Sequence, residues 1–333
     1  MKVNKTIGVN GFGRIGRYVT RLAILDPEVE IALINDLSDV NTLMHLFKYD
    51  SIHGRFEIDF KIQGNLVIFS NGKKISFSQE RDPGLIEWSK YGVSTVVECT
   101  GLFLTKELAS KHFKGGASKV VLSAPAKDAD IKTIVLGVND HLLSEHDHIV
   151  SNASCTTNNV APLIKVMLSM AEIDLCYIST IHSYTSDQRL HDSPHRDLRR
   201  ARAAGHSIIP TSTGAANAVV KIFPELNEKI SGGAIRVPVS DGSMTEITII
   251  VDKELEIEDI SRKMKEASES HLEGVLAINT DPIVSIDVIG SSASSVYDVS
   301  LSNVYGKMVR IVSWYDNESG YSNRLLELSK KVG

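Results

Sequence analysis

A run of spaced glycines near the start of the chain constrains its fold most. The apolar stretch Thr6–Asn10 is typical of a buried strand and leads directly into Gly11-Phe12-Gly13-Arg14-Ile15-Gly16. The residues that follow, to about Leu25, have helical spacing. Glycines here let the backbone turn tightly and approach a pyrophosphate, whose charge the helix N-terminus stabilises. The order strand, glycine loop, helix therefore predicts a dinucleotide-binding unit.

A second apolar strand, Ile31–Asn35, ends at Asp36. A carboxylate at this position accepts hydrogen bonds from the adenosine ribose hydroxyls and repels a 2′-phosphate. Asp36 could instead cap a turn or a helix, but its place at the end of the strand favours the cofactor role. We expect NAD rather than NADP.

The next hundred residues alternate between strand and helix patterns. A helix is expected over Asp39–Phe47, followed by short alternating runs between residues 56 and 77 that indicate a small antiparallel excursion. Buried parallel strands are expected at Thr95–Glu98 and Lys119–Leu122, with helical stretches between them. This alternation predicts a doubly wound α/β sheet.

The stretch Ser151-Asn152-Ala153-Ser154-Cys155-Thr156-Thr157-Asn158 follows a short apolar strand and precedes a helical pattern over Val160–Glu172. Cys155 is thus expected at a strand-to-helix turn, where unpaired N–H groups and the helix dipole lower a thiol pKa. A small cysteine packed at a helix start is the plain alternative. A partner is needed to decide between the two interpretations.

The strand pattern Cys176–Ile181 delivers such a partner at its end, His182. A histidine beside a thiolate can hold it as an ion pair and later act as a general base. Cys99 and Cys176 lie in apolar strand contexts, so we expect both to be buried and inert. Beyond His182, the patterns at Met244–Val251, 257–271 and 308–314 predict a second domain of α+β type.

The bulk composition excludes several classes of function. A net charge of −5 and a pI near 6.1 give no reason to expect nucleic acid or a membrane surface as the main partner. No apolar run is long enough to span a bilayer, and no signal-peptide core follows the first residues. Three cysteines among 333 residues make no disulfide scaffold, which suits a reducing cytoplasm.

Two segments, S-N-A-S-C-T-T-N and T-I-H-S-Y-T, closely resemble those of the phosphorylating glyceraldehyde-3-phosphate dehydrogenase family, and the resemblance runs essentially end to end. It implies a Rossmann NAD-binding domain over residues 1–154, with a C-terminal helix at about 318–333. It also implies an α+β catalytic domain with a mostly antiparallel sheet over 155–317. The implied activity is the glycolytic or gluconeogenic interconversion of glyceraldehyde 3-phosphate and 1,3-bisphosphoglycerate, with NAD and inorganic phosphate, in a cytoplasmic homotetramer.

The resemblance also assigns roles to individual residues. Cys155 becomes the nucleophile and His182 the base, and no metal is expected. The residues expected to bind the cofactor are Gly11, Gly13, Arg14, Ile15, Gly16, Asp36, Arg81, Ser123 and Asn317. Those expected to bind substrate or phosphate are Ser154, Thr156, Thr185, Arg200, Thr213, Gly214 and Arg236. Arg199 is the alternative to Arg200, and the arginine-rich stretch around them resembles the family's S-shaped loop rather than a nucleic-acid patch.

Three departures from the family pattern stand out. Ser319 occupies a position that is usually Trp, and Asp241-Gly242-Ser243-Met244 replaces the commoner P-N-V-S turn. The pair Ser193-Pro194 is intermediate between those of NAD-using and NADP-accepting members. Two other functions stay open: an erythrose-4-phosphate dehydrogenase, which uses water instead of phosphate, and a nucleotide-binding or adhesion module without turnover.

Overall fold

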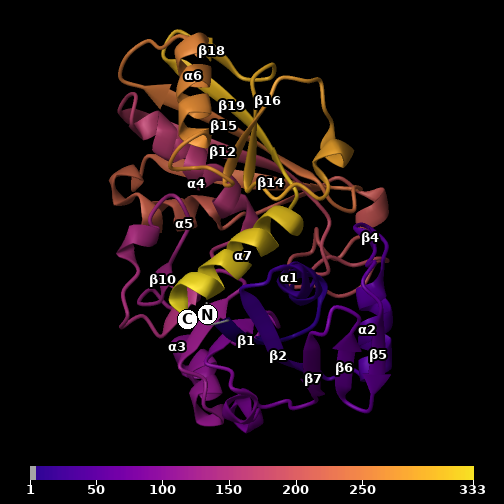
Figure 1. Cartoon of the computed structure of the whole chain (residues 1–333). Coiled ribbons are helices and arrows are strands. Elements are labelled where there is room, and N and C mark those ends of the chain that lie inside the picture. The colour runs from indigo at the N-terminus through magenta and orange to yellow at the C-terminus, as the bar shows by residue number, and fades with distance from the viewer. Residues whose placement is uncertain (1–4) are drawn as a thin grey trace. The chain divides into compact units, whose positions relative to one another are not determined.

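The computed structural model describes residues 5–333, which divide into two compact units (Figure 1). The first unit contains residues 5–134, 141–153 and 322–333. The second contains residues 135–140 and 154–321. None of the helices in the described range is long and apolar enough to cross a membrane.

A nine-stranded sheet forms the centre of the first unit. Its strands, in the order in which they lie across the sheet, are β10 (Lys132–Thr133), β11 (Ile149–Ser151), β9 (Lys119–Leu122), β8 (Thr95–Glu98), β1 (Lys5–Asn10), β2 (Val29–Asn35), β7 (Lys74–Ser78), β6 (Leu66–Phe69) and β5 (Phe60–Gln63). Every pairing from β10 to β7 is parallel, while β6 and β5 pair antiparallel. The predicted doubly wound sheet with an antiparallel excursion is confirmed.

The strand order reverses next to β1. The chain passes from β1 to β2 on one side and later places β8 on the other. Ligands of open α/β sheets bind at the carboxyl ends of the strands that flank such a reversal. Asn10 and Glu98, which are paired in register, mark that point.

Short helices and turns connect these strands. They include α1 (Arg14–Leu25), α2 (Val40–Lys48), α3 (Lys106–Ala109) and the hairpin of β3 (Tyr49–Asp50) with β4 (Gly54–Arg55). The α2 helix begins after Asp39, whose side chain accepts a hydrogen bond from the Thr42 N–H and so caps the helix. Phe12 anchors the glycine loop in the core by stacking on Phe47 and packing edge-on against Phe77.

The end of the chain returns to the first strands of this unit. Helix α7 (Ser319–Val332) is followed by Gly333, whose carbonyl accepts a hydrogen bond from the Lys5 ammonium. Lys330 forms ion pairs with Asp26 at 2.9 Å and Glu28 at 3.0 Å. The last residues therefore belong structurally with the first.

The second unit is built on an eight-stranded mixed sheet. Its strands, in order, are β13 (Ile209–Thr211), β14 (Ile230–Val237), β12 (Ile173–Ser183), β15 (Ser243–Val251), β19 (Met308–Tyr315), β17 (Ser295–Asp298) and β16 (Leu276–Asn279), with β18 (Asn303–Tyr305) paired to β19. Most pairings are antiparallel, as predicted, but β12 with β14 and β16 with β17 run parallel. The helices of this unit are α4 (Cys155–Leu168), α5 (Ala215–Ile222) and α6 (Ile257–Ser268).

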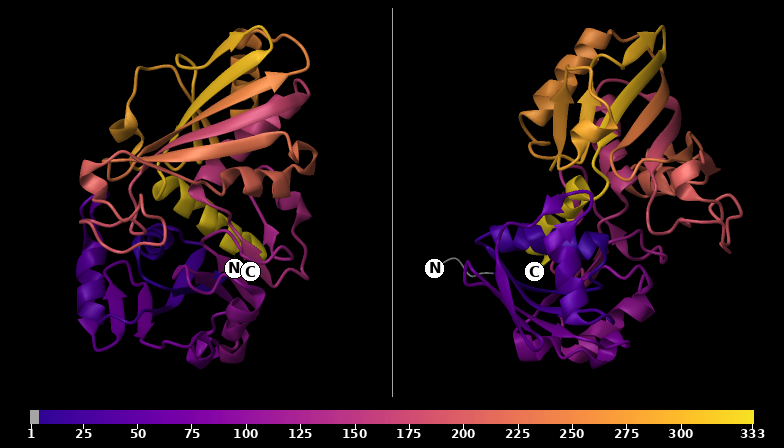
Figure 2. Two further views of the ribbon diagram at one scale, coloured as in Figure 1. Left: turned by 180° about the vertical axis from the view of Figure 1, so that it is seen from behind. Right: turned by 90° about the vertical axis from the view of Figure 1, so that its right-hand side faces the viewer.

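One face of this sheet carries the core. Along β15, every second residue from Ser243 to Val251 is buried and the residues between are half-exposed. The buried residues pack with Val160 and Met167 of α4 and with Met264 of α6. Figure 2 shows β12, β15 and β19 side by side, with these helices on a single face. The strict alternation is what a sheet covered on one side requires.

We predict that Ile247→Ala destabilises the protein much more than Thr248→Ala, because only Ile247 is fully buried in the core. The first change should cost about 2–5 kcal/mol of unfolding free energy and the second well under about 1 kcal/mol. Urea denaturation of the two variants measures both. Equal losses of unfolding free energy in the two variants would show that both faces of the sheet are buried.

Candidate active site

Cys155 is the first residue of α4, directly after a sharp turn. Ala153 has a left-handed backbone (φ 57°), uncommon for a residue with a side chain. Ser154 is the N-cap of α4, and its hydroxyl accepts a hydrogen bond from the Thr157 N–H at 3.1 Å. The thiol thus sits at the helix N-terminus, as predicted.

His182 lies next to this thiol. Its Nε2 is 3.4 Å from the Cys155 Sγ. The histidine was expected at the end of its strand, and it is the penultimate residue of β12 and is buried. The strand continues because β14 pairs with it in parallel register as far as Ser183. Backbone pairing therefore fixes the position of His182.

The hydrogen bonds of His182 determine which ring nitrogen carries the proton. Nδ1 lies 2.7 Å from the carbonyl oxygen of Ser183. Two lone pairs at that separation would repel, so this shorter contact favours donation from Nδ1 to the carbonyl, although the Arg236 Nη1, which can only donate, lies 3.0 Å from the same nitrogen. The Nε2 lone pair then faces Cys155. This is the tautomer that a general base toward the thiol needs.

Burial favours the neutral form of both reactive groups. Burial raises the pKa of the Cys155 thiol, although the Arg236 charge and the Thr156 N–H act in the opposite direction. Burial and the Arg236 charge lower the pKa of His182 to about 3. The expectation of a lowered thiol pKa was therefore wrong. The helix terminus is present, but loss of water around the sulfur outweighs it.

Arg236 stands directly across the strand pairing from His182. Its Nη1 donates to the Ser183 carbonyl at 3.0 Å and lies 3.0 Å from the His182 Nδ1. Its Nε is buried without a hydrogen-bond partner, and no described residue gives the guanidinium a carboxylate partner. An unpaired, largely buried arginine is costly unless an anion completes it. The contacts therefore favour an anion site here.

Arg200 is held by a different set of contacts. Its guanidinium donates to the carboxylate of Asp187, to the Thr211 hydroxyl at 2.9 Å and to the Ser212 carbonyl at 3.3 Å. Thr213 and Gly214 follow immediately along the chain. Arg199 is exposed, and its side chain has no polar partner in the described part of the chain. Arg200 is thus held in place by its neighbours, and its choice over Arg199 stays a prediction.

The remaining predicted phosphate-binding residues lie at turns and helix starts of this unit. Thr185 is half-buried, and its N–H donates to the side chain of Gln188 at 3.3 Å. Thr213 accepts a hydrogen bond from the Ala215 N–H, and Gly214 is the exposed N-cap of α5. Thr156 is buried, with its hydroxyl 2.9 Å from that of Tyr315. Their roles stay predictions.

Asn317 has a fixed amide orientation. Its Oδ1 accepts hydrogen bonds from the hydroxyls of Ser183 at 2.7 Å and Ser243 at 2.8 Å. Its Nδ2 makes no hydrogen bond within residues 5–333 and is left to donate to a ligand. Such an orientation suits recognition of a carboxamide oxygen, the role expected for Asn317.

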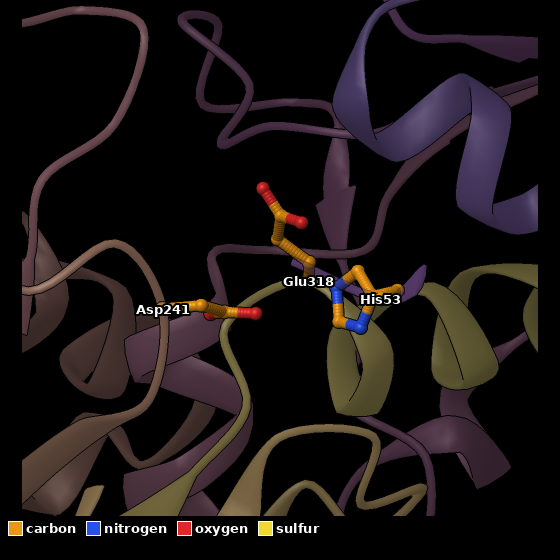
Figure 3. A group of neighbouring side chains, drawn as sticks. All are labelled: His53, Asp241 and Glu318. Atoms are coloured by element: carbon orange, nitrogen blue, oxygen red, sulfur yellow. The ribbon is translucent and has the colours of Figure 1, made fainter. Parts of the chain in front are cut away.

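Two acids of the second unit also approach one another. Carboxylate oxygens of Asp241 and Glu318 lie within 4.8 Å (Figure 3). The Asp241 turn and the segment before Ser319 are brought together because Ser243 pairs with Tyr315 across β15 and β19. Two of the three departures from the family pattern are thus neighbours in space. A pair of acids alone does not establish a metal site.

The first unit has a cavity of about 540 Å³ at the carboxyl ends of its central strands. It is lined by Asn10, Gly11, Gly13, Asn35, Asp36, Leu37, Glu80, Arg81, Cys99, Thr100, Leu102 and Phe103. The cavity lies where the strand order reverses. Four of the nine predicted cofactor residues line it, and Arg14, Ile15 and Gly16 follow in the first turn of α1.

The glycines fit a dinucleotide in different ways. Gly11 has φ +93°, and a Cβ there would lie 2.8 Å from the Thr100 nitrogen. A Cβ on Gly16 would lie 2.1 Å from the Gly11 carbonyl oxygen, so this glycine lets α1 pack closely. Gly13 has no atom within 4 Å of such a Cβ, which leaves open space at the helix N-terminus. A pyrophosphate can approach the backbone there.

The other predicted cofactor residues have defined partners. Asp36 accepts hydrogen bonds from the N–H groups of Phe12 and Ser38, which hold its carboxylate at the cavity rim. Arg14 forms an ion pair with Asp50 at 2.6 Å. Burial opposes ionisation of Asp50, but hydrogen bonds from His53, Ile52 and Arg14 outweigh it and lower its pKa to about 2. Ser123 hydrogen-bonds Cys99, which was expected to be buried but is partly exposed and lines the cavity, whereas Cys176 is buried as expected.

Several residues that support the site were not predicted. They are Ser183 and Ser243, which orient Asn317; Asp187, which holds Arg200; and Tyr315, which contacts Thr156. Tyr315 also packs edge-on against His182, with ring centroids 6.0 Å apart. Each lies beside a residue or turn already singled out, but only the tertiary contacts show its role.

Comparison with known proteins agrees with this geometry. Residues 5–106 match the family described as "Glyceraldehyde 3-phosphate dehydrogenase, NAD binding domain", and residues 154–317 match its "C-terminal domain". A protein named glyceraldehyde-3-phosphate dehydrogenase from Geobacillus stearothermophilus is 50% identical over 328 residues, covering 98% of this chain and 97% of that protein. The chain belongs to the glyceraldehyde-3-phosphate dehydrogenase family.

Other members of the family are similar over the same extent. Glyceraldehyde-3-phosphate dehydrogenase 1 of Bacillus subtilis is 48% identical over 98% of this chain and 97% of its own length. Glyceraldehyde-3-phosphate dehydrogenase of Thermotoga maritima is 48% identical over 96% and 97%. The first unit contains the family's NAD-binding domain, so NAD as cofactor is confirmed.

We predict that Gly16→Ala and Gly13→Ala damage the NAD site differently. The Gly16 methyl would overlap the Gly11 carbonyl, so α1 must shift and unfolding free energy should fall by about 1–3 kcal/mol. Gly13→Ala should leave stability within about 0.5 kcal/mol but weaken NAD binding, because its methyl fills the open approach. Denaturation and NAD titration separate these effects, and a Gly16 variant of normal stability would contradict the packing argument.

We predict that iodoacetamide modifies Cys155 faster than Cys99 or Cys176. Burial raises the pKa of both other thiols to about 12, and they lack a neighbouring base. Since the Cys155 thiol pKa is also raised, its alkylation rate should climb through neutral pH without the plateau of a preformed ion pair. Peptide mapping across pH, with Cys155→Ser as control, measures both. Equal labelling of the three cysteines would refute the assignment.

Proposed function

We propose that the protein catalyses the oxidation and phosphorylation of D-glyceraldehyde 3-phosphate to 1,3-bisphosphoglycerate, with NAD and inorganic phosphate. The observation that carries this proposal is the Cys155 Sγ lying 3.4 Å from a histidine nitrogen whose lone pair faces it. Family membership supports the substrate, because the relatives carry the name of this enzyme.

The reaction begins at the sulfur. His182 accepts the thiol proton at Nε2 as the sulfur attacks the aldehyde carbon, and a hemithioacetal forms on Cys155. The N–H of Cys155, at the start of α4, stabilises the negative charge that develops on the substrate oxygen. The imidazolium returns this proton to the substrate oxygen, which gives the hemithioacetal hydroxyl, and the neutral His182 then serves as the base that removes it as the hydride leaves. NAD, when bound, accepts the hydride, which leaves a thioester on Cys155.

Two anion sites serve the two phosphates of this reaction. Arg236 and Thr185 bind the phosphate of the aldehyde, and the unpaired guanidinium supports this assignment. Ser154, Thr156, Arg200, Thr213 and Gly214 bind the inorganic phosphate that attacks the thioester. Asn317 orients the nicotinamide carboxamide through its free Nδ2.

The preference for NAD rests on Asp36. Its carboxylate, held by the N–H groups of Phe12 and Ser38, repels a 2′-phosphate. The Ser193-Pro194 pair permits some use of NADP.

The functional protein is a cytoplasmic homotetramer. The sheet face opposite α4 and α6 exposes Leu175, Tyr177 and Met308, and the segment before β13 exposes Leu190, Leu198 and Ile208 to 71–81%. Apolar surface of this extent is typical of subunit interfaces. Light scattering coupled to gel filtration tests the assembly.

We predict a burst without turnover when phosphate is absent. One equivalent of NADH per active site should form quickly and the reaction should then nearly stop, because the acyl-enzyme lacks its acceptor. Phosphate, or arsenate as its mimic, should restore steady turnover. Stopped-flow absorbance measures the burst.

Thr213 variants provide the matched control. Thr213→Ala should raise the phosphate concentration needed for half-maximal turnover by about tenfold or more and leave the burst intact, whereas Thr213→Ser keeps the hydroxyl and should behave normally. Fast steady turnover without phosphate, with a free acid as product, would instead identify a hydrolytic dehydrogenase such as that for erythrose 4-phosphate.

A further inference from the structure

A buried carboxylate lies behind the NAD cavity and is not part of its lining. Glu98, the last residue of β8, is fully buried. Its Oε2 accepts a hydrogen bond from the Asn10 Nδ2 at 2.6 Å and lies 3.0 Å from the His112 Nε2. Its Oε1 accepts from the N–H of Thr100 at 2.8 Å and from the hydroxyl of the same residue. Four contacts therefore converge on one side chain.

On the side away from the cavity, Trp88 determines the tautomer of His112. The indole N–H of Trp88 points to the His112 Nδ1 at 3.1 Å, and both rings are fully buried. An indole nitrogen can only donate, so Nδ1 accepts and Nε2 carries the hydrogen that points to Glu98. Glu98 is thus the acceptor for four donors, and none of the four can be turned into an acceptor without cost elsewhere.

On the side toward the cavity, the hydrogen bonds continue from Asn10 to residues that line it. The Asn10 Oδ1 accepts from the Asn35 Nδ2 at 2.8 Å, and Asn35 in turn bonds the backbone of Glu80 through both amide atoms. Asn10, Asn35, Glu80 and Thr100 all line the cavity. One continuous chain of hydrogen bonds therefore joins the carboxyl ends of β8, β1 and β2 to the segment after β7.

This series of hydrogen bonds crosses the point where the strand order reverses. After β1 the polypeptide turns toward β2, and after β8 it turns to the opposite side. The two loops that line the cavity therefore diverge. Asn10 and Glu98 are neighbours in register at the divergence. Beyond the backbone bond from the Cys99 N–H to Asn10, side chains must set the spacing of the loops.

We propose that Glu98 is a positioning residue for NAD, which holds the Asn10 and Thr100 walls of the cavity at the spacing the cofactor requires. The proposal rests on the NAD site of the first unit and not on the reaction assigned above. Glu98 touches the cofactor only through these neighbours.

The isosteric change Glu98→Gln tests this role. An amide replaces one acceptor oxygen by an NH₂ group, which then faces donors in either orientation. In one orientation the NH₂ group faces the donors of Asn10 and His112. In the other orientation it faces the Thr100 N–H. If His112 changes tautomer to relieve the clash, its new Nδ1–H opposes Trp88. The mismatch must therefore move a cavity wall or disturb the indole.

We expect Glu98→Gln to weaken NAD binding roughly tenfold, with kcat at saturating NAD and the KM for the aldehyde nearly unchanged. Calorimetric titration without aldehyde measures the binding, so an error in the proposed reaction would not affect it. In a Trp314→Phe background, the emission of Trp88 should also shift. Unchanged NAD affinity would overturn the proposal.

One control separates positioning from general stability. Val96→Ala removes a buried apolar group from the same strand and should lower stability without altering NAD affinity. An equal loss of affinity in both variants would reduce Glu98 to a structural residue and refute the proposal.

A second pair of variants serves if Glu98→Gln does not fold. Thr100→Val keeps the shape of the side chain but removes the hydroxyl donor, whereas Thr100→Ser keeps the donor and removes a methyl. Weaker NAD binding in the valine variant alone supports the proposal. Equal losses in both, or a loss only with serine, would indicate direct contact of the methyl with NAD and contradict it.

Discussion

The parallel pairing of β12 with β14 controls the chemistry of the second unit. It places His182 opposite Arg236 and lets both contact one carbonyl, that of Ser183. The short contact with this carbonyl favours a proton on Nδ1, and the other nitrogen faces the sulfur. Because α4 packs on the same sheet, Cys155 is brought to that nitrogen by the core itself. The same sheet thus determines both the catalytic geometry and the apolar packing.

Low polarity around these groups decides their resting charges. A sulfur and an imidazole that have lost most of their water both favour the neutral form, and a nearby guanidinium penalises the imidazolium further. The same environment makes the Arg236 charge strongly attractive to an anion, because little water screens it. The site therefore holds one uncompensated positive charge beside two neutral reactants, which suits a negatively charged aldehyde.

Much of this organisation could be predicted from local sequence, because it depends on local rules. The glycine loop, the end of β2 at Asp36 and the helix start at Cys155 follow from backbone sterics and capping. The end of β12 at Ser183 did not, since only pairing with β14 extends the strand past Ile181. The raised pKa of the thiol also escaped prediction, because burial of the sulfur depends on the tertiary structure. The partners of Glu98 and Asn317 could not be predicted either, because they lie on elements that are distant in sequence.

The return of the chain end to the first unit has a consequence for biosynthesis. Lys5 and the β1–β2 region make contacts with Lys330 and Gly333, which are translated after the second unit. The nascent nucleotide-binding unit must therefore wait, incomplete at this edge, while the whole second unit is translated. Synthesis at about 5–20 residues per second makes this interval roughly ten seconds or longer. During that time the free ends of β1 and β2 are a surface on which chaperones can act.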